Sequence, residues 1–78
     1  MEEIGTLDRL AIGQRAQIVQ LNAPQEIRIR LMALGFVPGG SIRARLESPW
    51  GDPVAYEVCG AVIALRRADA RQIEIKVT

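Results

Sequence analysis

Alternation of apolar and polar residues predicts several short strands along the chain. In 42–47, 54–59 and 73–77, apolar side chains recur at every second position, as in strands with one buried face and one wet face. The stretch 15–21 has β-branched residues at its centre and no breaker, so it also predicts a strand. A further strand is expected over 62–65, directly after a glycine-containing turn.

The turn between the predicted strands 54–59 and 62–65 is short enough to predict their register. A two-residue turn at Gly60–Ala61 has glycine at its first central position, which suits a type II′ hairpin. Tyr56 then lies opposite Leu65. Cross-strand partners share a face, so we expect one inward-facing set from both strands: Tyr56, Val58, Ile63 and Leu65.

One stretch has helical rather than alternating spacing. Ile27, Leu31 and Leu34 follow one another at intervals of four and three, which places them on one face of a helix over 24–34. Gly35 stands where the left-handed residue that ends a helix belongs. A helix of this length is unstable alone in water, so its apolar face must pack on the strands.

Five short strands separated by glycine and proline predict a small antiparallel β-barrel, with the helix inserted after the first strand. Short helical turns are expected between Thr6 and Gly13 and over 66–71. Closure of the barrel is expected to leave no free strand edge. The whole chain, 1–78, is expected to form one domain, and its predicted core comprises Ile18, Leu31, Leu34, Ile42, Tyr56, Val58, Ile63, Leu65 and Ile75.

Composition argues against most kinds of catalytic and metal site. The 78 residues include no histidine and one cysteine, so an internal disulfide is impossible and the commonest metal ligands are missing. No phosphate-binding loop or dinucleotide fingerprint occurs. We therefore expect no enzyme, no cofactor and no tight ferrous iron site. Apolar runs are too short to span a bilayer and the start carries no export signal, which favours the cytoplasm.

Candidate binding residues come from the single tryptophan and the arginines. Trp50 lies at the tip of a predicted hairpin, where it either folds back onto the barrel or anchors a partner. Arg43 and Arg45 share one strand face, which is either a solvated surface or a binding surface. Arg28 is placed on the helix surface by spacing alone.

Four segments, in this order and at these intervals, are similar to a known family. They are Leu7–Gly13, Arg30–Gly39 with its Leu-Gly and Pro-Gly pairs, Pro49–Pro53, and Ile63–Arg66 followed by Ala70 and Ile73. The chain resembles the FeoA family, the small cytoplasmic component of bacterial ferrous iron uptake. The resemblance implies an SH3-like β-barrel. It also implies an association with transition metals, which no ligand cluster in this sequence supports.

The resemblance further implies a non-enzymatic accessory role for FeoB, the membrane iron permease with a cytoplasmic GTPase domain. The protein would reach the membrane only through that partner. Its hypothetical docking residues are Trp50, Arg43, Arg45 and Arg28. The alternative is a small-barrel protein that binds nucleic acid through its central arginines. A net charge of +1 and three aromatic residues favour the permease partner and no nucleic acid. The sequence specifies neither oligomeric state nor the effect on GTP hydrolysis.

Overall fold

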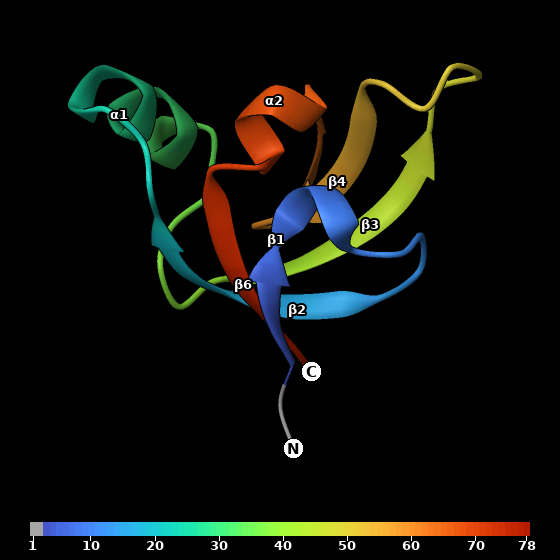
Figure 1. Cartoon of the computed structure of the whole chain (residues 1–78), viewed down its shortest axis with the longest axis horizontal. Coiled ribbons are helices and arrows are strands. Elements are labelled where there is room, and N and C mark those ends of the chain that lie inside the picture. Colours follow the sequence, from blue (N-terminus) through green and yellow to red (C-terminus); the bar gives the residue numbers. More distant parts are fainter. Residues whose placement is uncertain (1–2) are drawn as a thin grey trace.

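One curved, six-stranded antiparallel sheet makes up most of the structure (Figure 1). The structure is a computed structural model and describes residues 3–78. The strands are β1 (Glu3–Thr6), β2 (Arg15–Leu21), β3 (Ser41–Glu47), β4 (Val54–Val58), β5 (Ala61–Leu65) and β6 (Ile73–Val77). They lie in the order β1-β6-β2-β3-β4-β5. A 3₁₀ turn η1 (Leu7–Arg9), helix α1 (Gln25–Ala33) and helix α2 (Arg67–Ala70) complete the fold.

The mainly β fold with one inserted helix is confirmed, and both short helical turns lie where they were predicted. A sixth strand, β1, was not predicted. It pairs with the C-terminal strand β6, with Gly5 opposite Ile75. Ile4 is the only large apolar side chain in β1, so this strand shows no alternation that a sequence pattern could reveal.

The end of α1 changes one member of the predicted core. Gly35 has a φ of 112°, and the N–H of Phe36 donates to the carbonyl oxygen of Leu31 at 3.0 Å. This Schellman arrangement turns the chain inward, so that Phe36 is fully buried beside the equally buried Leu31. The prediction for Leu34 was wrong, because its side chain is 42% exposed.

The remaining predicted core residues lie inside, with Ile63 only partly buried against the others. The core also takes in residues that were not predicted. The largest fully buried ones lie in η1, after α1 and at the first positions of β4 and β6: Leu7, Phe36, Val54 and Ile73. The hydroxyl of Tyr56 donates to the carbonyl oxygen of Leu7 at 3.4 Å, which links η1 to the centre of the sheet.

The β4–β5 hairpin turns one residue earlier than predicted. Cys59 and Gly60 form the turn, with φ values of 50° and 78°, as a type I′ turn requires. Tyr56 is therefore opposite Ile63 rather than Leu65. The pairing shifts by two residues in total, so every side chain keeps its predicted face of the sheet.

A bulge in β3 changes which residues face outward. Ala44 lies opposite Tyr56, whereas Leu46 lies opposite Ala55, so Arg45 is an extra residue in the ladder. The alternation over 42–47 predicts Ile42, Ala44 and Leu46 on one inner face, and for Leu46 this prediction was wrong. Leu46 joins the outer face beside Ala55 and is 61% exposed.

The sheet has two edge strands, β1 and β5. Strands β1 and β5 each pair on one side only, and no ladder joins them within residues 3–78. The expectation that barrel closure removes all free edges was wrong. Within the same residues, no helix is long and apolar enough to cross a membrane.

Candidate functional site

The loop between β3 and β4, residues 48–53, presents the tryptophan to solvent. Trp50 is 90% exposed, so it does not fold back onto the barrel end. The loop is nevertheless held in shape from within. The N–H of Gly51 donates to the carbonyl oxygen of Ser48 at 2.8 Å, and that of Ser48 donates to Pro53 at 3.1 Å. Trp50 is thus a large exposed apolar side chain on an ordered turn.

Arg67, at the start of α2, fixes this loop to the rest of the domain. Its guanidinium donates through Nε to the carbonyl oxygen of Gly51 and through Nη2 to Glu47 Oε2 at 3.1 Å. Its Nη1 donates to the carbonyl oxygen of Asp8 at 2.8 Å, and its backbone N–H donates to Asp52 Oδ1 at 3.0 Å. One side chain therefore holds together η1, the end of β3 and the 48–53 loop. No periodicity in the sequence distinguishes Arg67 from its neighbour Arg66.

The β3 bulge places an ion pair and an apolar side chain next to each other on the outer face. Arg45 Nη1 lies 3.0 Å from Glu57 Oε1, and both side chains are partly exposed. Leu46 is the next residue along β3 and is exposed on the same face as Ala55. The loop of the same β3–β4 hairpin carries Trp50, so we group Trp50, Leu46 and Arg45 as the candidate surface. Leu46 was missed because a bulge cannot be read from alternation.

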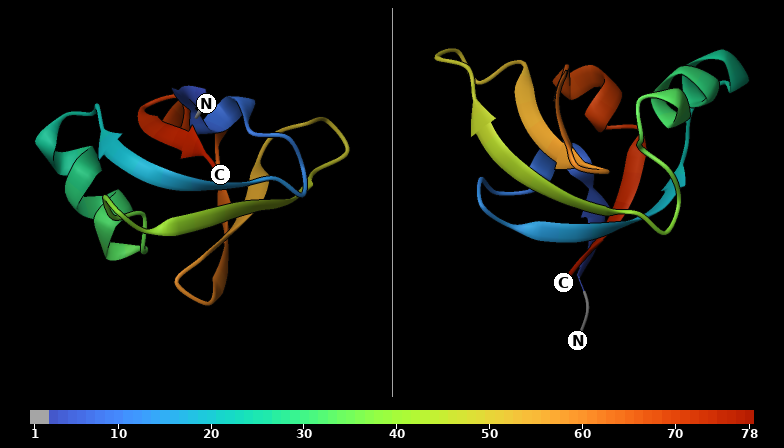
Figure 2. Two further views of the ribbon diagram at one scale, coloured as in Figure 1. Left: turned by 90° about the horizontal axis from the view of Figure 1, so that it is seen from below. Right: turned by 180° about the vertical axis from the view of Figure 1, so that it is seen from behind.

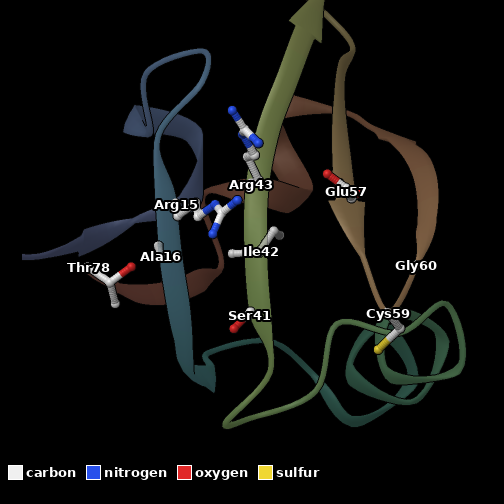
Figure 3. Close-up of a pocket in the computed structure, with 9 residues that line it drawn as sticks. All are labelled: Arg15, Ala16, Ser41, Ile42, Arg43, Glu57, Cys59, Gly60 and Thr78. Carbon is white, nitrogen blue, oxygen red and sulfur yellow. The ribbon is translucent and has the colours of Figure 1, made fainter.

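Arg43 lies on the same strand but in a different setting. It lies opposite Glu57 in the β3–β4 ladder and opposite Arg15 in the β2–β3 ladder. Both arginines line a surface groove of about 370 Å³ that runs over β2, β3 and the β4–β5 turn (Figure 3). The two predicted strand arginines, Arg43 and Arg45, therefore have different surroundings. Arg45 is paired with a carboxylate, and Arg43 faces the groove.

Arg28 does not join this surface. It lies on α1, which is at the opposite end of the molecule from the 48–53 loop in every view of Figures 1 and 2. The four predicted docking residues therefore do not form one contiguous surface. Trp50 and Arg45 share the β3–β4 hairpin, Arg43 lies farther along β3, and Arg28 is remote.

Comparison with known proteins identifies the family. A family model described as the FeoA domain matches residues 5–77. The chain belongs to the FeoA family. The family serves in ferrous iron transport, and the resemblance noted in the sequence is confirmed.

Individual relatives agree with the assignment to FeoA. A Fe(2+) transport protein A/Fe(2+) transporter FeoB fusion protein of Porphyromonas gingivalis is 35% identical over 71 residues. These cover 91% of this chain but only 8% of the fusion protein. A Fe(2+) transport protein A of Campylobacter jejuni is 32% identical over 72 residues, which cover 92% of this chain and 97% of that protein.

The fold comparison gives the same family. The crystal structure of Stenotrophomonas maltophilia FeoA complexed with zinc superimposes with a TM-score of 0.78 and 30% identity. The match covers 90% of this chain and 87% of that one. That protein is described as a prokaryotic SH3 domain protein, which agrees with the curved antiparallel sheet of this FeoA-family chain.

Metal and acid–base chemistry find little support in this FeoA-family chain. Within residues 3–78, no group of three or more His, Cys, Asp or Glu residues could hold a metal ion. Cys59 is exposed in its turn, and its Sγ donates to the carbonyl oxygen of Gly35 at 3.5 Å. Burial raises the pKa of Tyr56 to about 12, so its phenol stays protonated at neutral pH.

Proposed function

We propose that this protein is a non-enzymatic accessory module of ferrous iron uptake that acts in the cytoplasm by binding the cytoplasmic part of the FeoB iron transporter. The P. gingivalis relative supports this partner, because it carries both proteins in one chain. Two domains joined in one chain have a high effective concentration relative to each other, which promotes binding between them. Separate chains must then supply the missing affinity through a docking surface.

The single observation that carries the proposal is the exposure of Trp50 on a braced loop. Tryptophan is among the residues that contribute most to protein interfaces, since one side chain buries a large apolar area. A loop that is already ordered loses little conformational entropy on binding, which further favours affinity. The proposed docking surface is therefore the outer part of the β3–β4 hairpin, formed by Trp50, Leu46 and Arg45. Arg43 flanks it, and Arg28 lies outside it.

Calorimetric titration against the purified cytoplasmic domain of FeoB from the same organism tests the proposal. Saturable one-to-one binding with a negative heat-capacity change is expected, because the surface buries apolar area. Raising the salt concentration should weaken binding only modestly, since Arg45 is the one charged member of the surface and is already paired. Absence of measurable heat and of complex formation in gel filtration would overturn the proposal.

Nucleic acid is the weaker partner class on structural grounds. Binding of single strands relies on exposed aromatic rings and unpaired cationic side chains. Of the three aromatic residues, Phe36 and Tyr56 are buried, so Trp50 alone is available for stacking. Arg30, Arg45, Arg67 and Arg71 each pair with a carboxylate. A gel-shift experiment with generic single- and double-stranded DNA should show no retardation, and micromolar, steeply salt-dependent binding would favour this alternative.

A further inference from the structure

Two arginines face each other directly across neighbouring strands. Arg15 on β2 and Arg43 on β3 are register partners, and their flanking residues Ala16 and Ile42 both point into the core. Both arginines therefore lie on the outer face of the sheet. Side chains at such positions have Cβ atoms about 5 Å apart, and like charges placed there destabilise a sheet. A negative charge between the two guanidinium groups would reduce this repulsion.

Among the described residues, neither Arg15 nor Arg43 forms an ion pair with a carboxylate. Glu57 is the register partner of Arg43 on the other side, yet its carboxylate bonds to Arg45 Nη1 at 3.0 Å. Arg45 follows Arg43 on the same outer face of β3, so the carboxylate of Glu57 is within its reach. Arg43 Nε is buried and has no hydrogen-bond partner within residues 3–78. A buried guanidinium N–H without an acceptor is unfavourable and uncommon in folded proteins.

The two guanidinium groups lie in a groove that has room for a ligand. Figure 3 shows the Arg15 side chain reaching from β2 toward β3, on the same side as Arg43. The groove has a volume of about 370 Å³, within the range of small-molecule sites. Ser41 and Thr78 also line it, and each can add a hydroxyl donor. Glu57 is the one acidic side chain of the lining, and Arg45 neutralises it.

We propose that this groove, defined by Arg15, Arg43 and Ser41, binds a phosphate group. Two forked guanidinium groups from adjacent strands offer several N–H donors to one tetrahedral anion. A phosphate carries up to two negative charges and has enough oxygen atoms to accept from both arginines and from a hydroxyl. It would remove the repulsion between Arg15 and Arg43. The site adjoins the Trp50 surface along β3, because Arg43 flanks that surface, but it does not depend on the proposed transporter partner.

The proposal is tested by NMR titration of the isotope-labelled protein at constant ionic strength. Sodium phosphate replaces sodium chloride in one series, and sodium acetate replaces it in a second. The guanosine nucleotides GMP and GTP form a third series, which distinguishes a free phosphate from one carried on a nucleotide. With phosphate, we expect saturable chemical-shift changes of the Arg43 Nε–H and of the Ser41 and Gly60 amides. The affinity for acetate from the same signals should be at least tenfold lower.

Matched variants separate the site from general charge effects. Arg15→Gln and Arg43→Gln should each lower phosphate affinity at least tenfold, whereas Arg28→Gln, which removes an exposed arginine from α1, should leave it unchanged. Phosphate should raise the thermal unfolding midpoint of the wild type. Arg15→Gln should raise that midpoint in chloride, because it removes the repulsion between the two arginines, and should show no further rise with phosphate. Unsaturable shifts, equal binding of acetate, or equal losses in all three variants would overturn the proposal. Intact amide spectra establish that each variant is folded.

Discussion

Arg67 donates a hydrogen bond from its guanidinium to the carbonyl oxygen of Gly51, the residue that directly follows Trp50. The same side chain bonds to the backbone of Asp8 and pairs with Glu47. The most exposed large apolar side chain of the described residues is thus carried by a loop that α2 fixes in place. This combination of exposure and order is what a docking surface needs, and it forms the basis of the account.

Arg67→Ala should destabilise the domain and loosen the loop. Several charge-assisted hydrogen bonds disappear together, so the expected loss in the free energy of unfolding is about 1–3 kcal/mol. Urea denaturation measures this loss, and hydrogen exchange of the Gly51 amide should accelerate more than that of amides in β6. The matched control is Arg71→Ala. Arg71 is an exposed arginine whose Nε lies 3.8 Å from Asp8 Oδ2, and its loss should cost less than about 0.5 kcal/mol. Equal losses in both variants would contradict the role given to Arg67.

Leu31 and Leu34 form a natural pair for testing how α1 packs. Leu31 is fully buried, so Leu31→Ala should cost about 2–5 kcal/mol, which could be most of the stability of so small a domain. Leu34 is 42% exposed, so Leu34→Ala should cost less than about 1 kcal/mol. Thermal unfolding of the two variants checks the difference. Similar midpoints would show that the helix packs through another face.

The single tyrosine gives a pH signal for the state of the core. Burial raises the pKa of Tyr56 from 10.0 to about 12 in the folded protein. Above pH 10 the unfolded chain loses this proton first and binds fewer protons than the native state, so stability should fall as pH rises from 10 to 12. Tyrosinate absorbance follows the titration directly. Tyr56→Phe should remove this part of the pH dependence, and an ordinary native pKa would show that Tyr56 is not buried.

Much of the fold could be predicted from the sequence because alternation is a local property. The helix, five of the strands and most of the core follow from spacing, β-branched residues and turn signals, and Tyr56 and Val58 are buried as expected. Leu34 could not be assigned correctly, because the Schellman turn at Gly35 brings Phe36 inward in its place. Leu46 was misplaced by a bulge that leaves no mark on the pattern.

The candidate site was predicted only in part. Trp50 stood out as a lone tryptophan at a turn, but its exposure depends on how the loop is held, and Arg67 comes from a distant part of the sequence. Arg43 and Arg45 looked equivalent along the strand. Glu57 pairs with Arg45, and the β2–β3 register places Arg43 opposite Arg15, which a single strand's pattern does not reveal.

The central claim is that Trp50 anchors the FeoB transporter, and one comparison tests it most directly. Calorimetric titration against the cytoplasmic domain of FeoB is carried out with Trp50→Ala and with Ile29→Ala, which truncates a 60% exposed apolar side chain on the remote α1. The account predicts that Trp50→Ala weakens binding at least tenfold, about 1.4 kcal/mol, with unfolding unchanged, while Ile29→Ala binds as wild type. Wild-type affinity in Trp50→Ala, or an equal loss in Ile29→Ala, would contradict it.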